Sequence, residues 1–245
     1  MVVKRIDGRS KGTMRPLVCE LSCLNRADGS SLWKSGSTHI LAGVFGPIAP
    51  QNMNNEEDVA AHISVVIKSG VEHLKFNNEM EKFLTDILSS CIDVSLFPRC
   101  VIELVLQIVQ SDGSLLSCLL HAAVAALMDA GVDLLYLPVA TTCLVRTPID
   151  SEEPKSGRNK NSVIWLDPTS AEEEEERDSS ILVLVNEQRQ PDKILGSHTV
   201  GSGISLDDFL ACIQIAQNAC AAVPSFWRLA IEQKLNRESM TLYSR

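Results

Sequence analysis

The most constraining feature of the chain is an uncharged run, LLSCLLHAAVAALM, from Leu115 to Met128. Leu and Ala favour a helix, and apolar side chains would point in nearly every direction around it, so the helix should be buried. Gly131 suits the position just after a helix C-terminus. The stretch Gln110–Gly131 therefore predicts a buried helix around which the other elements must pack.

The start of this helix suggests an anion site. Asp112 and Ser114 are cap-type residues, and Gly113 permits an unusual backbone conformation. A helix N-terminus presents unpaired N–H groups and a partial positive charge, which together suit a phosphate group. The next two residues are Leu115 and Leu116, however, and neither can bind an anion.

The overall composition argues against some classes of function. The 245 residues carry a net charge of −9, which argues against a free-standing nucleic-acid binder, although partner subunits could supply a basic surface. The eight Cys residues lie mostly in apolar segments and suggest free thiols in a reducing compartment. No Cys/His spacing indicates zinc, so we expect no metal and no cofactor. We also expect no membrane span and an intracellular protein.

The remaining pattern predicts a mixed sheet flanked by helices in one domain covering residues 1–245. Residues 1–16 form an irregular arm, residues 148–162 a flexible polar loop, and residues 205–236 a C-terminal helix that Pro224 could kink. Ser205 is the predicted cap of that helix. Residues 78–93 form an amphipathic helix, and strands are expected at 18–24, 30–35, 38–46, 61–69, 100–109, 139–147, 163–167, 179–187 and 193–201.

Four segments, in order, resemble the RNase PH family. They are RIDGRSKGTMRPL, LNRADGSSLWKSGSTHILAGVFGP, SLFPRCVIELVLQIVQSDGS with the helix ending ALMDAG, and VIWLDPTSAEEE. LFPR is typical of the exosome branch. The resemblance implies an α+β fold of the RNase PH type (ribosomal protein S5 domain 2-like), with a mixed sheet layered with helices. It also implies head-to-tail assembly into six-membered rings.

Active members of the family cleave RNA from its 3′ end with inorganic phosphate as the nucleophile, so cations must bring two anions together. The resemblance places their helix arginine at Asp86, a second arginine at Ser89, and a Gly-Thr-Arg turn at Ser114, Leu115 and Leu116. No Arg or Lys occurs from Val101 to Val145. We therefore expect a former active site that repels phosphate, with no guanidinium nearby.

The acidic positions of the family are harder to assign. Glu172 and Asp178 are six residues apart, which imitates the family spacing, but matching them to the strand needs a one-residue insertion. Without that insertion the family positions fall on Ala171 and Arg177. The run of glutamates at 172–176 makes a chance match easy, and we expect it to form a solvated acidic turn.

Other polar and aromatic residues can be interpreted without a catalytic role. Lys68, Lys75, Lys82 and Arg99 could contact RNA, or could be scattered surface cations. His121 is expected to be a hydrogen-bonded core histidine. Trp33, Trp165 and Trp227 are expected in the core or at an interface, because their separation in sequence does not suggest a base-stacking platform.

The resemblance implies a non-catalytic structural subunit of the RNA exosome ring that supports 3′-to-5′ RNA processing by another subunit. Its partners would be other RNase PH-like ring subunits, RNA-binding cap subunits, the catalytic exosome nuclease and RNA, in the nucleus, nucleolus and cytoplasm. One alternative is an active nuclease, phosphorolytic or metal-dependent, acting on RNA or DNA through Glu172, Asp178 or Asp167. Another is an RNA-binding module outside the exosome.

Overall fold

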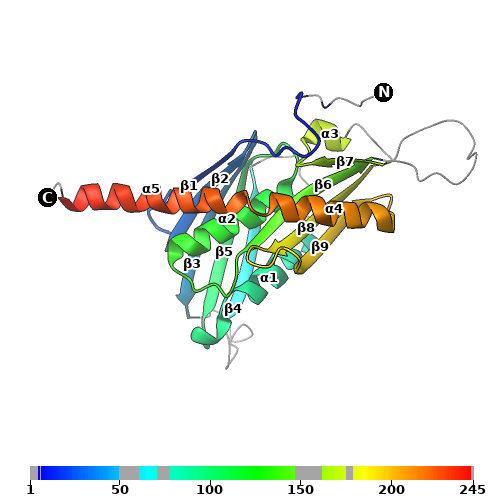
Figure 1. Cartoon of the computed structure of the whole chain (residues 1–245). Coiled ribbons are helices and arrows are strands. Elements are labelled where there is room, and N and C mark those ends of the chain that lie inside the picture. Colours follow the sequence, from blue (N-terminus) through cyan, green and yellow to red (C-terminus); the bar gives the residue numbers. More distant parts are fainter. Residues whose placement is uncertain are drawn as a thin grey trace, which may run out of the picture.

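The computed structural model describes Arg5 and residues 7–49, 61–70, 78–146, 162–174 and 179–243. These residues form two sheets with helices between and beside them (Figure 1). The five-stranded sheet has the order β1-β2-β3-β5-β4, and the four-stranded sheet has the order β7-β6-β8-β9. All neighbouring strands are antiparallel except β4 and β5. The strands are β1 (Leu17–Leu21), β2 (Gly29–Ser35), β3 (Thr38–Ile48), β4 (His62–Ser69), β5 (Val101–Gln110), β6 (Pro138–Arg146), β7 (Val163–Leu166), β8 (Ser179–Glu187) and β9 (Ile194–Gly201).

Helix α2 (Leu115–Ala130), which contains the uncharged run, lies between the two sheets, in contact with β2 and β3 on one side and β6 on the other. All its residues from Leu116 to Leu127 are buried, so the sequence prediction of a buried helix is confirmed. His121 is one of them, and its Nε2 accepts a hydrogen bond from the Ala140 N–H at 3.2 Å. Burial lowers the pKa of His121 to about 4, which keeps the ring neutral at physiological pH. The prediction of a hydrogen-bonded core histidine is also confirmed.

A second helix, α1 (Asn78–Cys91), bridges the two sheets elsewhere. Its buried face consists of Leu84, Ile87, Leu88 and Cys91 and packs on β4. On the other side it meets β9 at Gly196, where an added Cβ would lie 2.7 Å from Ile87 Cδ1. Side chains from both sheets join one continuous buried cluster around α1 and α2. The predicted α+β layering of sheet and helices is therefore observed, but the strands of the described residues form two sheets rather than one, and the five-stranded sheet is the mixed one.

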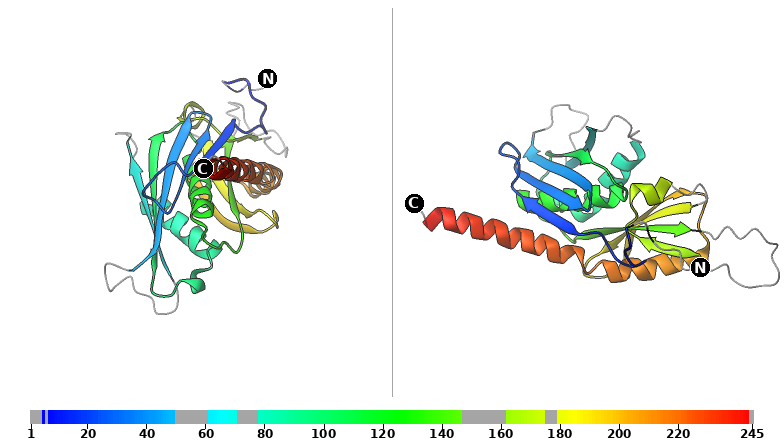
Figure 2. Two further views of the ribbon diagram at one scale, coloured as in Figure 1. Left: turned by 90° about the vertical axis from the view of Figure 1, so that its left-hand side faces the viewer. Right: turned by 90° about the horizontal axis from the view of Figure 1, so that it is seen from above.

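Two helices follow β9 and run along the molecule from the four-stranded sheet to the five-stranded sheet (Figures 1 and 2). Helix α4 (Leu206–Ala219) covers the face of β6 and β8 that α2 leaves free, which explains why β6 is buried on both faces. Helix α5 (Val223–Tyr243) packs on β1 and then extends past the body. The interruption lies at residues 220–222, and Pro224 stands in the first turn of α5, where a proline is tolerated.

The stretch Leu206–Met240 passes a test for membrane crossing by length and composition, with a mean hydropathy of 1.3 in its best window. One such helix is weak support for a span. The break at residues 220–222 interrupts the stretch, and its apolar side chains at Cys212, Ala216, Val223 and Trp227 are buried against the two sheets. Part of the apolar composition of this stretch therefore serves packing within the protein.

Two elements were not predicted from the sequence. A short 3₁₀ helix, η2, spans Val94–Leu96, and α3 spans Ser170–Glu174 in the expected acidic turn. Trp33, Trp165 and Trp227 are all buried, and the rings of Trp33 and Trp227 lie 6.2 Å apart, each against His121. The predicted flexible loop at 148–162 lies outside the described residues, apart from Ser162.

Candidate functional site at the start of α2

The backbone before α2 turns sharply. Gly113 has φ +75° and Ser114 has φ +49°, so two successive residues adopt the left-handed conformation. Ser114 occupies the N-cap position, but its side chain makes no cap hydrogen bond. Its hydroxyl donates instead to the Pro168 carbonyl at 3.0 Å. The prediction that Ser114 caps the helix is therefore wrong, because its left-handed backbone directs the hydroxyl away from the first turn.

A carboxylate from a distant segment occupies the start of the helix. The Ser114 backbone N–H donates to Oε1 of Glu173 at 2.8 Å. An anion at this position is favoured by the unpaired N–H groups and by the helix dipole. The protein thus fills the predicted phosphate position with one of its own carboxyl groups. Leu116 is 4% exposed and Leu115 is half-buried, so both leucines pack inward rather than line an open anion site.

The segment 167–174, which contains α3, covers the loop before α2. An added Cβ on Gly113 would lie 2.5 Å from the Pro168 carbonyl oxygen, so the two backbones are as close as glycine permits. Oδ1 of Asp112 accepts hydrogen bonds from the Ser170 hydroxyl at 2.9 Å and from its N–H at 3.3 Å. The segment therefore leaves no open space above Gly113 for a substrate.

An arginine from the N-terminal arm does reach this loop. Nη2 and Nε of Arg15 donate to the two carboxylate oxygens of Asp167 at 2.7 and 3.0 Å, and other N–H groups of the same side chain donate to the carbonyls of Asp112 and Gly113. Burial opposes ionisation of Asp167, but the hydrogen bonds and charge of Arg15 outweigh it and hold the pKa below its ordinary value. The expectation that no guanidinium lies nearby is therefore wrong. This guanidinium is nevertheless neutralised by Asp167 and committed to internal partners.

Arg5 makes a second buried ion pair. Its Nη2 and Nε donate to the carboxylate of Glu172 at 2.7 and 2.9 Å, and Glu172 is only 1% exposed. Burial opposes ionisation here too, but the hydrogen bonds from Arg5 lower the pKa of Glu172. The predicted solvated acidic turn is therefore wrong at this position. The charge pattern near residue 172 could not show a partner that lies 167 positions away.

The other predicted positions of the former active site are not gathered here. Asp86 and Ser89 lie on the exposed face of α1, and α1 and α3 are well separated in Figure 1. Asp178 lies outside the described residues. Sequence reasoning missed Arg5, Arg15 and Glu173. The first two stand within the RIDGRSKGTMRPL arm that carried the family resemblance, which is the one sequence signal that could have indicated them.

The candidate RNA-contacting cations do not form one patch. Lys68 and Lys82 are exposed near the same end of β4, because the Ile67 N–H donates to Glu81 of α1 at 2.8 Å. Arg99 is also exposed, but it precedes Cys100, whose carbonyl pairs with His62 at the other end of β4. That strand length corresponds to a separation of about 20 Å. Lys75 lies outside the described residues.

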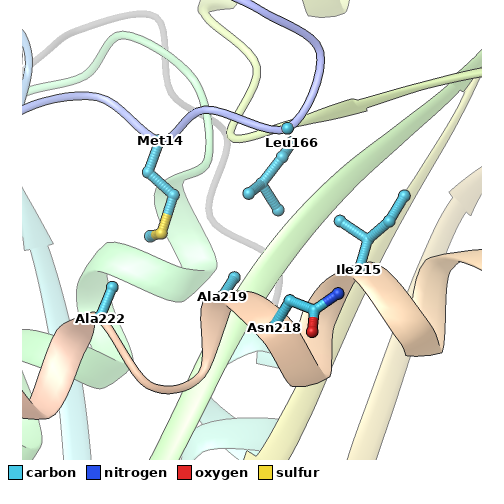
Figure 3. A pocket seen from close by; sticks show the side chains of 7 residues that line it. Met14, Leu166, Ile215, Asn218, Ala219 and Ala222 are labelled. Carbon is cyan, nitrogen blue, oxygen red and sulfur yellow. The ribbon is translucent and has the colours of Figure 1, made fainter.

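A separate hollow of about 370 Å³ lies between the arm and the junction of α4 and α5 (Figure 3). Met14 and Leu166 face Ile215, Ala219 and Ala222 across it. Asn218 supplies the polar side chain of the lining, and none of the lining residues is titratable, so this hollow lacks acid–base groups. Within the described ranges, no group of three or more His, Cys, Asp or Glu side chains is arranged to hold a metal ion.

Comparison with known proteins identifies relatives of the whole chain. Residues 13–133 match the family described as 3′ exoribonuclease family, domain 1 (RNase_PH). A protein of Arabidopsis thaliana named exosome complex exonuclease RRP46 homolog is 30% identical over 97% of this chain and 99% of its own length. The crystal structure of rice (Oryza sativa) Rrp46 superposes with a TM-score of 0.77 at 32% identity, over 91% of this chain and 98% of that one. An Archaeoglobus fulgidus exosome structure with RNA bound to the active site has a TM-score of 0.70 at 18% identity, over 91% and 92% of the two chains, which is a likeness of fold.

Proposed function

Because the chain belongs to the RNase PH family of 3′ exoribonucleases, we propose that it is a non-catalytic subunit of an exosome ring, supporting RNA processing and degradation by other subunits. The relatives that match nearly its full length are named as exosome proteins of the RRP46 type. The proposal that the chain is non-catalytic rests on the hydrogen bond from the Ser114 N–H to Glu173. An internal carboxylate at that position competes with any phosphate nucleophile.

Electrostatics support the same proposal. The start of α2 is surrounded by the side chains of Asp112, Asp167, Glu172 and Glu173. Arg5 and Arg15 reach it and are paired with the first three of these acids. A phosphate ion would have to displace Glu173 and would find no uncommitted arginine among the described residues of this site. Repulsion between the acids and an incoming phosphate raises the free energy of binding further.

The partners that follow from this role are other RNase PH-like ring subunits, RNA-binding cap subunits, a catalytic exosome nuclease and RNA. The chain would act as a single domain over residues 1–245, in the nucleus and nucleolus and also in the cytoplasm. Exposed apolar side chains at Leu206, Leu210, Leu229, Leu235 and Met240 on α4 and α5 supply surface that a ring neighbour could cover. Exposed Lys68 and Lys82 are candidates for weak RNA contact.

The catalytic part is tested by incubating the purified protein with 3′-tailed RNA and inorganic phosphate. We expect no release of nucleoside diphosphates above a buffer blank, whereas an active phosphorolytic member of the family serves as the positive control. Release that disappears in Asp167→Asn or Glu172→Gln, but persists in the exposed control Glu174→Gln, would establish the alternative function, an active nuclease.

The assembly part is tested separately by affinity purification from cell extract. We expect co-purification of other ring subunits in a particle of several hundred kilodaltons, compared with 26.8 kDa for one chain. A hydrodynamic mass near that of the single chain would contradict ring membership and would favour a module that acts outside the exosome. Imaging of a tagged chain would test the proposed localisation.

A further inference from the structure

Among the described residues, the outer strands of the two sheets are β1, β4, β7 and β9, and internal contacts shield the first three. An outer strand presents backbone N–H and C=O groups to any extended chain, so proteins usually protect it. At β4 the Ile67 N–H donates to the Glu81 carboxylate at 2.8 Å. At β7 the Leu166 N–H donates to the Lys11 carbonyl of the arm at 2.8 Å. Strand β1 has only five residues and lies beside α5.

The fourth outer strand, β9, lacks such protection. Its eight residues, ILGSHTVG, include no proline and no charged side chain, the residue types that usually discourage a further strand. Within the described ranges, its backbone hydrogen bonds join it to no segment other than β8. Ile194 and Val200 are exposed on it. The free side of β9 is therefore able to accept another strand.

Helix α4 provides an apolar surface beside this edge. Strand β9 ends at Gly201 and α4 begins at Leu206, while Gln217 near the other end of α4 donates to the Asp192 carboxylate, just before β9, at 3.1 Å. The helix therefore runs back along β9. Helical positions four, seven and eleven residues apart share one face, so Leu206 and Leu210 lie on the same side of α4 as Gln217. Both leucines are exposed on this side.

We propose that the free edge of β9 accepts an extended segment of a partner protein, which adds as a fifth strand to the four-stranded sheet. Backbone hydrogen bonds to β9 hold the segment, and its alternate side chains point toward α4. Because those side chains meet Leu206 and Leu210, the segment carries an apolar residue at every second position. This inference goes beyond the ring role, since it specifies the segment and not the protein that carries it.

A second copy of this chain is a poorer occupant of the same edge. Thr199 and Ser197 pair with Leu182 and Leu184 of β8, which pack in the buried cluster beneath α4. The side of β9 that faces α4 is therefore polar. A second β9 added about a twofold axis perpendicular to the sheet would place hydroxyl groups against the exposed leucines of α4, so an alternately apolar segment fits better.

A synthetic peptide tests the edge directly. The probe has valine and serine at alternate positions over the length of β9, with one lysine at each end for solubility. We expect amide hydrogen exchange in β9 to slow roughly tenfold when the peptide binds, with no change in β1, β4 or β7. The same peptide N-methylated at alternate residues should give no protection, because it lacks the N–H groups that pair with β9.

Two pairs of variants locate the binding surface. Val200→Lys puts a charge on the free edge and should weaken peptide binding roughly tenfold. Val18→Lys is its matched control, because Val18 lies on the outer strand β1 with a similar exposure, 45% against 51% for Val200, and binding should not change. Leu210→Ser on α4 should also weaken binding, whereas Leu229→Ser, equally exposed on α5, should not.

Three outcomes would overturn the proposal. The first is no protection of β9 at a peptide concentration of about 1 mM, and the second is equal protection by the N-methylated peptide. The third is protection of β9 that rises with protein concentration in the absence of peptide, together with a doubled hydrodynamic mass, because a second copy would then occupy the edge. None of these outcomes bears on ring membership, which the purification experiment decides.

Discussion

Helices α2 and α4 both begin after a serine, yet the two starts are built in opposite ways. At α4, Ser205 has an extended backbone, and its hydroxyl accepts a hydrogen bond from the Asp208 N–H at 3.2 Å. At α2, Ser114 is left-handed and buried, and Glu173 accepts the hydrogen bond from its N–H. An exposed helix start is completed by its nearest neighbours, whereas a buried start is completed by segments far away in the chain.

The largest expected effect comes from the arginine that supports the buried start. Arg15→Ala removes the hydrogen-bonded ion partner of the buried Asp167 and leaves it the longer 3.9 Å ion pair with Arg9, so we expect a loss of about 3 kcal/mol in the free energy of unfolding. Urea unfolding measures it. The exposed arm residue Lys11 gives the control Lys11→Ala, for which a change within about 0.5 kcal/mol is expected. If Arg15→Ala lowers the free energy of unfolding as little as Lys11→Ala does, the arm contributes little to stability at the start of α2.

A smaller effect is expected from the close backbone contact between Gly113 and the segment 167–174. Gly113→Ala places a Cβ 2.5 Å from the Pro168 carbonyl oxygen at a residue with φ +75°. Strain and overpacking should together cost about 2–3 kcal/mol. Gly131→Ala separates the two causes, because Gly131 has φ +73° but nothing within 4 Å of an added Cβ. If both variants lose the same stability in thermal or urea unfolding, the close approach of the segment 167–174 is not what requires glycine at Gly113.

The smallest effect belongs to the exposed start. Ser205→Ala removes the cap of α4 and should destabilise the protein by ~1 kcal/mol, with faster amide exchange confined to the first turn of that helix. Ser205→Asp should restore most of the loss, because aspartate also caps well. A loss of several kcal/mol, or faster exchange that spreads to α2, would contradict the view that this start is local.

The same contrast explains what the sequence could predict. Periodicity located α1, α2 and every strand, and Ser205 and Gly131 were identified as caps because their partners lie within a few residues. The surroundings of α2 were predicted less well. Arg5 and Glu172 lie 167 positions apart, Arg15 and Asp167 152, and Ser114 and Glu173 59, so no window of sequence contains both members of a pair. Charge counting near Leu116 therefore missed the arginines, and charge counting near Glu172 suggested solvent exposure where the structure has burial.

The occupation of the α2 start by Glu173 has a consequence for how such a chain could change over generations. An arginine newly introduced at Leu115 or Leu116 would meet the carboxylate of Glu173 before any free phosphate, and the two would neutralise each other. Loss of Glu173 alone would empty the position without supplying a cation. Under the proposed non-catalytic role, a gain of anion binding at this position would thus need changes in two segments 59 positions apart, and neither change alone would bind an anion.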